Sequence, residues 1–105
     1  MAIYHFESQV ISRGDGRSAV AAAAYRHAAR MEFEREDRVA DFSNKKNVAH
    51  SEFMAPDDAP GWLHSMMEGR SAAEISEAFW NKVEHSETRR DAQLSKEFVL
   101  ALPKE

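Results

Sequence analysis

The sequence contains no cysteine, which excludes a disulfide framework and a metal site built on thiolates. It has no apolar run near the ~20 residues that a membrane-spanning helix needs, and no internal repeat or low-complexity linker. The first ten residues lack a basic stretch followed by an apolar core, so they do not resemble a secretion signal. We therefore expect the 105 residues to form one domain in the cytoplasm.

The charge is distributed unevenly along the chain. Hydrophobic residues make up 43% and charged residues 30%, a globular composition, and the net charge of -4 argues mildly against a nucleic-acid partner. Residues 1–50, however, carry eight basic and seven acidic side chains, whereas residues 51–105 carry six and eleven. Because DNA binding needs only a local basic surface, the average charge does not exclude DNA.

The first half of the chain predicts a strand followed by a helix. Residues 2–11 alternate, and their even-numbered side is the more apolar, so we expect a strand with that side facing the core. A turn follows at 13–17, where glycine accepts positive φ at little cost. Ser18 is the expected N-cap of a helix that continues to about Phe33, because the alanine-rich run 19–24 has high helix propensity.

A second helix is predicted in the other half. Ser71 and Glu74, three residues apart, form a capping box, and we expect the helix to end near Glu87. Its apolar face consists of residues spaced four apart, which are Ile75, Phe79 and Val83.

Strand candidates lie on either side of this second helix. Residues 39–47 predict a loop or a short strand, 48–54 predict a strand, and a proline-framed turn with Trp62 precedes the helix. Residues 94–102 alternate again and predict a final strand. This order of elements favours an α+β sandwich.

Several short motifs occur in an order that is typical of one family. They are Tyr4-His5-Phe6, Val10-Ile11-Ser12-Arg13, Gly16-Arg17-Ser18-Ala19, Ala23-Ala24-Tyr25-Arg26, His50-Ser51-Glu52, Pro56, Trp80-Asn81-Lys82-Val83-Glu84, Arg90-Asp91-Ala92-Gln93, Lys96-Glu97 and Leu102-Pro103. No single tripeptide is specific, but the ordered set spans nearly the whole chain. With it the sequence resembles plasmid mobilisation relaxases of the MobA/MobL family, including the relaxase part of TraA-type conjugal transfer proteins.

The resemblance implies a fold, an activity and partners. The fold is a two-layer α+β sandwich with a mainly antiparallel central sheet, the HUH-like relaxase fold, of which residues 1–105 would form the N-terminal part with an incomplete sheet. The activity is the nicking of one DNA strand at a plasmid transfer origin during conjugation: Tyr25 attacks the scissile phosphate and stays joined to the 5′ phosphate. Single-stranded DNA and accessory relaxosome proteins are the implied partners.

The resemblance also implies a divalent metal, Mg or Mn, held by a cluster of histidines. The five histidines of this sequence, at positions 5, 27, 50, 64 and 85, are scattered and show no ligand spacing. We therefore expect the cluster to lie beyond Glu105, with no metal-ligand set inside residues 1–105. These residues alone are expected to bind no metal cofactor and to cleave DNA weakly or not at all.

Tyr25 is the predicted nucleophile. A tyrosine two turns into a helix is more often a partly buried core residue with its hydroxyl at the surface, and the resemblance is what favours catalysis. The phenol is a weak nucleophile at neutral pH, so the reaction needs a nearby cation or base. Tyr4, the one other tyrosine, is expected in the core.

Four arginines are candidate DNA ligands. Arg26 and Arg30 are four apart, which places them on one face of the predicted helix, where a phosphate or, for Arg30, the carboxylate of Glu34 would offset their repulsion. Arg13 and Arg17 flank the glycine turn just before the helix N-terminus, where guanidinium and amide groups together are able to bind phosphate.

A further set of residues is proposed for acid–base catalysis or for orienting a metal ligand. Three are glutamates within the matched motifs and the fourth is a histidine on the first strand: Glu52, Glu84, Glu97 and His5. The alternative for each glutamate is an exposed, solvated carboxylate, and for the histidine a structural hydrogen bond.

Three hypotheses follow for the function. The first is part of a relaxase catalytic domain, the second a noncatalytic DNA-binding accessory module of a mobilisation system, and the third a small interaction domain without a DNA role. Salt-dependent binding of single-stranded DNA separates the third from the others. A covalent protein–DNA adduct separates the first from the second.

Overall fold

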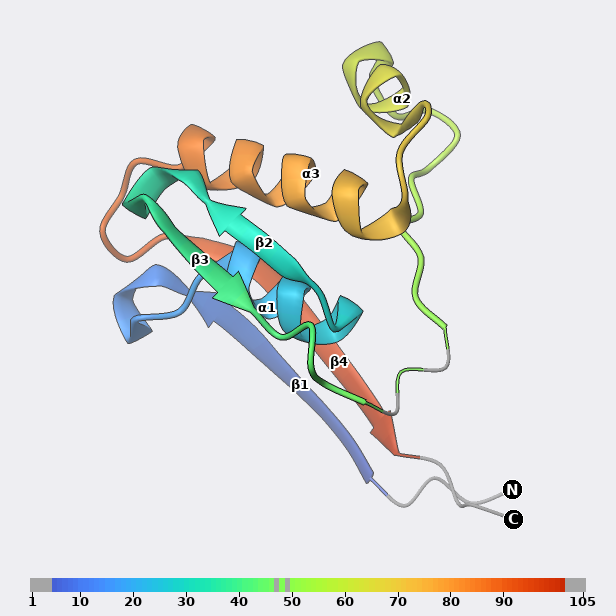
Figure 1. The fold of residues 1–105 in the computed structure, drawn as a ribbon. Coiled ribbons are helices and arrows are strands. Elements are labelled where there is room, and N and C mark those ends of the chain that lie inside the picture. The colour runs from blue at the N-terminus through green and yellow to red at the C-terminus, as the bar shows by residue number, and fades with distance from the viewer. Residues whose placement is uncertain (1–4, 47, 49, 102–105) are drawn as a thin grey trace.

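The computed structural model describes residues 5–46, 48 and 50–101 (Figure 1). In chain order the elements are β1 (His5–Ser12), η1 (Arg13–Asp15), α1 (Ala19–His27), β2 (Arg30–Phe33), η2 (Glu34–Glu36), β3 (Arg38–Asp41), α2 (Gly61–Met67), α3 (Ala72–Ser86) and β4 (Gln93–Ala101). The strands form two antiparallel pairs, β1 with β4 and β2 with β3. Helix α1 is central, because it contacts α3 and both strands of the β2–β3 hairpin. None of the described helices is long and apolar enough to span a membrane.

The β1–β4 pair buries the opposite face from the one predicted. The predicted strand is present from His5, and residues 2–4 lie outside the described part, but Phe6 on its even side is 59% exposed. Phe98 of β4, on the same face, is 62% exposed, whereas Ile11 on the odd side is fully buried. The prediction chose the buried face by hydrophobicity alone and was wrong. Helix α1 covers the more polar face, where the pairs Gln9–Glu97 and Ile11–Ser95 lie.

Helix α1 begins as predicted and ends earlier. The Ser18 hydroxyl accepts a hydrogen bond from the Ala21 amide at 2.9 Å, which confirms the N-cap. The helix stops at His27, and Ala28 adopts a left-handed conformation with φ 52°, so the predicted continuation to Phe33 is wrong. Residues 30–33 instead form β2 with alternating burial, because a period of two places Met31 and Phe33 together against α1.

Helix α3 confirms the second helix prediction. Ser71 and Glu74 form a reciprocal capping box, and the helix ends at Ser86. The side chains that it buries include polar ones, among them Asn81 and Glu84. The Asn81 side-chain amide donates to the Glu32 carbonyl at 2.7 Å and accepts from the Glu34 amide at 3.0 Å, which fixes α3 against the hairpin.

The segment between β3 and α2 differs from its prediction. Among the described residues of 48–54, none is in a strand, although Phe53 packs its ring against Phe79 at 5.2 Å between centroids. A strand needs a neighbour to satisfy its backbone groups, and no strand pairs with this segment in the described structure. Trp62 lies in helix α2 rather than in a turn, and the short strand within 39–47 is confirmed as the end of β3.

Candidate active site

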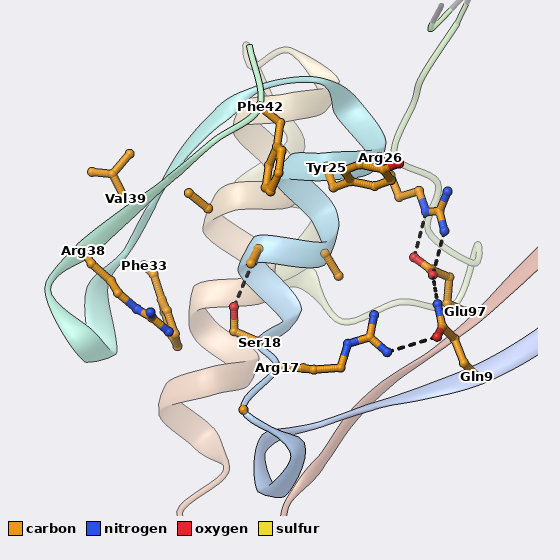
Figure 2. Close-up of a pocket in the computed structure, with 14 residues that line it drawn as sticks. Gln9, Arg17, Ser18, Tyr25, Arg26, Phe33, Arg38, Val39, Phe42 and Glu97 are labelled. Atoms are coloured by element: carbon orange, nitrogen blue, oxygen red, sulfur yellow. Dashed lines mark hydrogen bonds and ion pairs between the residues drawn. The ribbon is translucent and has the colours of Figure 1, made fainter. Parts of the chain in front are cut away.

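The Tyr25 side chain lies at the surface of the last turn of α1, where it is 43% exposed (Figure 2). Two groups from the loop after β3 hold its ring. Phe42 packs edge-on at 5.3 Å between centroids, and the Lys45 ammonium lies 3.8 Å from the Tyr25 ring centroid. The same ammonium donates to the Tyr25 carbonyl at 3.2 Å. The phenol is therefore exposed, fixed in place and close to a positive charge.

Local turn chemistry explains why the loop reaches Tyr25. The Asp41 carboxylate accepts hydrogen bonds from the Ser43 amide at 2.9 Å and the Ser43 hydroxyl at 2.6 Å. The Phe42 amide donates to the Ala29 carbonyl, and the Lys45 amide donates to the Phe42 carbonyl, each at 3.0 Å. Sequence reasoning missed both Phe42 and Lys45. The aspartate followed two residues later by a serine was the available signal, because such pairs stabilise turns.

A chain of hydrogen bonds crosses from the sheet to α1 beside Tyr25 (Figure 2). Arg26 makes a bidentate contact with the Glu97 carboxylate, with both distances 2.8 Å. The Gln9 amide donates to Glu97 at 2.6 Å and accepts from Arg17 at 3.1 Å. These hydrogen bonds, the Arg26 contact first, hold the pKa of Glu97 below its usual range, and the same contact raises the pKa of Arg26. Glu97 is thus an anion that orients the guanidinium of Arg26, the residue that follows Tyr25 in the sequence.

A pocket of about 480 Å³ joins these groups. It lies between α1, the β2–β3 hairpin and the β1–β4 pair, as Figure 2 shows. The predicted residues that line it are Arg17, Tyr25, Arg26 and Glu97. The structure therefore brings together one candidate nucleophile, two candidate phosphate ligands and one candidate carboxylate.

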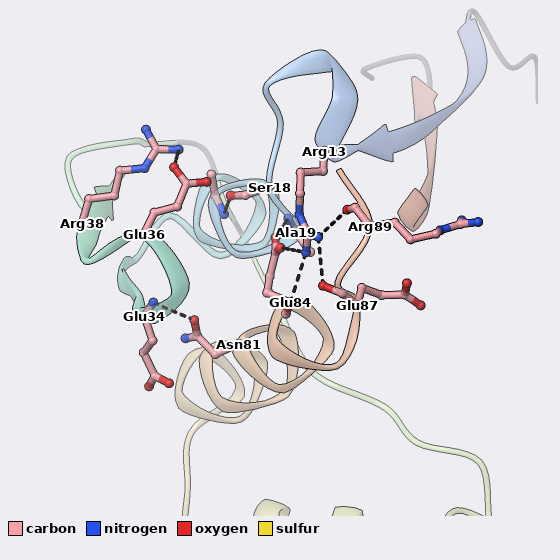
Figure 3. Close-up of polar contacts among 11 residues, drawn as sticks. Arg13, Ser18, Ala19, Glu34, Glu36, Arg38, Asn81, Glu84, Glu87 and Arg89 are labelled. Carbon is pink, nitrogen blue, oxygen red and sulfur yellow. Dashed lines mark hydrogen bonds and ion pairs between the residues drawn. The ribbon is translucent and has the colours of Figure 1, made fainter. Parts of the chain in front are cut away.

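Arg13 and Glu84 lie elsewhere, at the start of α1 (Figure 3). The Arg13 guanidinium donates to the Glu84 carboxylate at 2.8 Å and to the carbonyls of Glu87 and Arg89 at 2.9 and 2.7 Å. The other Glu84 oxygen accepts from the Ala19 amide at 2.9 Å. The Glu84 side chain is fully buried and that of Arg13 is 10% exposed, so in this arrangement both hold α1 in place.

The remaining candidates are dispersed. Arg30 lies on β2, opposite Asp41, so the prediction that it shares a helix face with Arg26 is wrong. Glu52 is exposed and lines a second cavity of about 310 Å³. His5 is the first residue of β1, and its side chain lies outside the described part. No group of three metal-ligating side chains occurs among the described residues.

The Arg26–Glu97 contact predicts a pH effect on stability. The folded state lowers the pKa of Glu97. Ionised Glu97 therefore adds to the free energy of unfolding above the ordinary glutamate pKa of about 4.3, and this stabilisation is lost as the pH falls through the lower pKa of the folded state. We expect Glu97→Gln to reduce the urea midpoint at pH 6 to 7 and to converge with the wild type once the pH falls below the lowered pKa of Glu97. Glu87→Gln, at an exposed site, is the control. A midpoint difference that persists unchanged at low pH would contradict this role.

Comparison with known proteins gives the family. The sequence model of the MobA/MobL family matches residues 17–105, so the chain belongs to the MobA/MobL family. It is 53% identical over its full length to the conjugal transfer protein TraA of Rhizobium radiobacter, covering 10% of that protein. It is 41% identical over its full length to the mobilization protein MobL of Acidithiobacillus ferridurans, covering 24% of it. The chain thus spans about a tenth of the TraA relatives it matches.

A solved structure shares the fold. It is described as "Molecular Basis of Vancomycin Resistance Transfer in Staphylococcus aureus", is 31% identical, and superposes with a TM-score of 0.78 over 97% of this chain and 47% of that one. The family resemblance and the α+β relaxase-type fold with antiparallel strands are therefore confirmed.

Proposed function

We propose that this chain is part of a relaxase catalytic domain that nicks one DNA strand at a plasmid transfer origin, with Tyr25 as the nucleophile. The similar proteins named TraA and MobL are conjugal transfer and mobilisation proteins, which supports a role in conjugative mobilisation. The observation that carries the chemical proposal is the position of Tyr25. Its exposed ring lies on the rim of a pocket that Arg17 and Arg26 also line.

The proposed step is a transesterification. The Tyr25 hydroxyl oxygen forms a bond to the scissile phosphorus, and the bond from phosphorus to the 3′ oxygen breaks. The phenol proton passes to solvent or a nearby base, and the leaving 3′ oxygen takes up a proton to become a free hydroxyl. The 5′ phosphate remains as a tyrosine ester, so the reverse reaction rejoins the strand without another energy source.

The cations around Tyr25 suit this step. Arg26 lies next to it in sequence, with its guanidinium carbon 5.3 Å from the ring centroid, and Lys45 lies closer still. A positive charge near the phenol stabilises negative charge that develops on its oxygen, and a guanidinium binds phosphate oxygens. Glu97 holds the Arg26 guanidinium on the β4 side of the pocket.

A divalent metal, Mg or Mn, remains part of the proposal for the complete domain. Bound to the scissile phosphate, it would neutralise charge in the transition state. The described residues do not fit such an ion, because no three of their ligating side chains lie together. The metal ligands would therefore come from outside the described residues. The roles proposed for Tyr25, Arg26 and Lys45 are those of side chains of this chain.

A covalent adduct tests the proposal. The full gene product is incubated with Mg²⁺ and a supercoiled plasmid that carries the transfer origin next to its gene, and the products are denatured. We expect nicks in one strand at one position, with protein attached at the 5′ end and an extendable 3′ hydroxyl at the other. Salt-dependent DNA binding without an adduct would indicate the accessory-module alternative and overturn the catalytic proposal.

Arg17 is expected to bind a backbone phosphate. Replacing it with alanine should make the plot of log binding constant against log salt concentration shallower by about 0.7, the contribution of one contact to single-stranded DNA. Fluorescence anisotropy with a labelled single strand measures this slope. Arg35→Ala is the matched control, because Arg35 is an exposed arginine in η2 that does not line the pocket. A slope that Arg17→Ala leaves unchanged would remove Arg17 from the DNA-binding surface.

A further inference from the structure

The pocket beside Tyr25 has an apolar part that the proposed transesterification does not use. Its floor and walls are formed by small and aromatic side chains, which are Ala21, Ala22, Phe33, Val39, Ala40 and Phe42. The volume of about 480 Å³ lies within the range of roughly 300–1,000 Å³ that is usual for sites of small organic groups. Phosphate chemistry alone gives no reason for such a surface.

We propose that this pocket holds one unpaired nucleobase of the DNA strand, from a nucleotide next to the phosphate that Tyr25 attacks. The inference rests on the proposed function for the identity of the strand. Tyr25 itself lines the pocket, so a base inside it belongs to a nucleotide adjacent to the bond that is cut. The pocket thereby selects a strand with a base free to leave the stack.

The lining matches the surfaces of a base. The faces of a base are flat and apolar, and they stack on aromatic side chains such as that of Phe42, which is 37% exposed. The alanine side chains at 21 and 22 leave room on the α1 side. Polar groups near the edge of the base are those of Gln9 and Ser18. The Gln9 amide already bonds to Glu97 and Arg17, and the Ser18 hydroxyl already caps α1, but an amide and a hydroxyl can each make one more hydrogen bond.

The charges on the rim match the backbone of a single strand. Arg17, Arg26 and Arg38 all line the pocket. Arg26 and Arg38 are ion-paired with Glu97 and Glu36, and their side chains are still 44% and 60% exposed. A base in the apolar interior leaves its neighbouring phosphates beside these guanidinium groups. A base pair within a duplex enters only if it unpairs and unstacks, which costs a few kcal/mol, so the geometry favours an already single-stranded partner.

Site-directed photocrosslinking tests the inference. The full gene product carrying Tyr25→Phe, which keeps the ring but cannot form an ester, is mixed below saturation with a single-stranded oligothymidylate that contains 4-thiothymidine. After irradiation and trypsin digestion, we expect crosslinks in the two peptides on opposite walls, residues 18–26 and 39–45. Ala21→Leu and Val39→Phe, which fill the pocket from those two walls, should each lower the crosslink yield about tenfold, within the range for loss of one stacked base.

Ala72→Leu is the matched control, because Ala72 is a half-buried helix residue that does not line the pocket. It should leave the yield unchanged. Crosslinks outside the two peptides only, or an undiminished yield in both filled variants, would overturn the nucleobase pocket. The assay measures no cleavage, so failure of the adduct test would remove the role of Tyr25 and leave this result standing.

Discussion

Tyr25→Phe is expected to abolish the covalent protein–DNA adduct completely while leaving DNA affinity within about twofold of the wild type. Phenylalanine has no oxygen to attack phosphorus, but its ring retains the edge contact with Phe42 and the contact with Lys45. Removing the nucleophile stops the chemical step, whereas the affinity for DNA falls only if the protein loses contacts with the DNA. Adduct yield on denaturing gels and anisotropy binding measure the two quantities.

The chain supplies an internal control for this prediction. Tyr4 is the one other tyrosine in the sequence, so Tyr4→Phe should leave the adduct yield unchanged. Digestion of the wild-type adduct should place the nucleotide on the peptide that contains Tyr25. An adduct that Tyr25→Phe still forms, or a nucleotide on another residue, would reject Tyr25 as the nucleophile.

Glu84→Ala is expected to lower the free energy of unfolding by about 3–5 kcal/mol, the usual cost of removing one partner of a buried ion pair. The change leaves the nearly buried Arg13 guanidinium without its carboxylate and the Ala19 amide without its acceptor. Urea denaturation followed by tryptophan fluorescence measures the loss, because Trp80 packs against the cores on both sides of α1. Such a loss would be a large part of the stability of a small domain.

Two variants separate the ion pair from general damage to α3. Glu87→Ala removes a nearby exposed carboxylate and should change stability by no more than about 0.5 kcal/mol. The double variant Arg13→Met with Glu84→Ala should lose less than the sum of the two single variants, because it leaves no unpaired buried charge. Strict additivity would show that Arg13 and Glu84 act independently. Because Ala19 begins the helix that carries Tyr25, adduct formation should fall together with stability.

Three local signals in the sequence were interpreted correctly. The N-cap at Ser18, the capping box at Ser71 and Glu74, and the final strand are present as predicted. Each depends on side chains that satisfy nearby backbone groups or on a period of two, so the sequence contains the whole argument. The extension of α1 to Phe33 failed because tertiary packing overrode helix propensity, which is a weak preference.

The sequence by itself determined the α+β class of the fold, where its main helices α1 and α3 begin, and that Tyr25 would lie on the first of them. Only the tertiary structure decided which face of the β1–β4 pair is covered and which charged residues gather around Tyr25. Glu97 is 72 positions from Tyr25 and reaches Arg26 through strand pairing, whereas Arg13 and Glu84 turn inward as a structural pair. Periodicity defines two faces for every strand or helix, but packing against distant elements selects which one is buried.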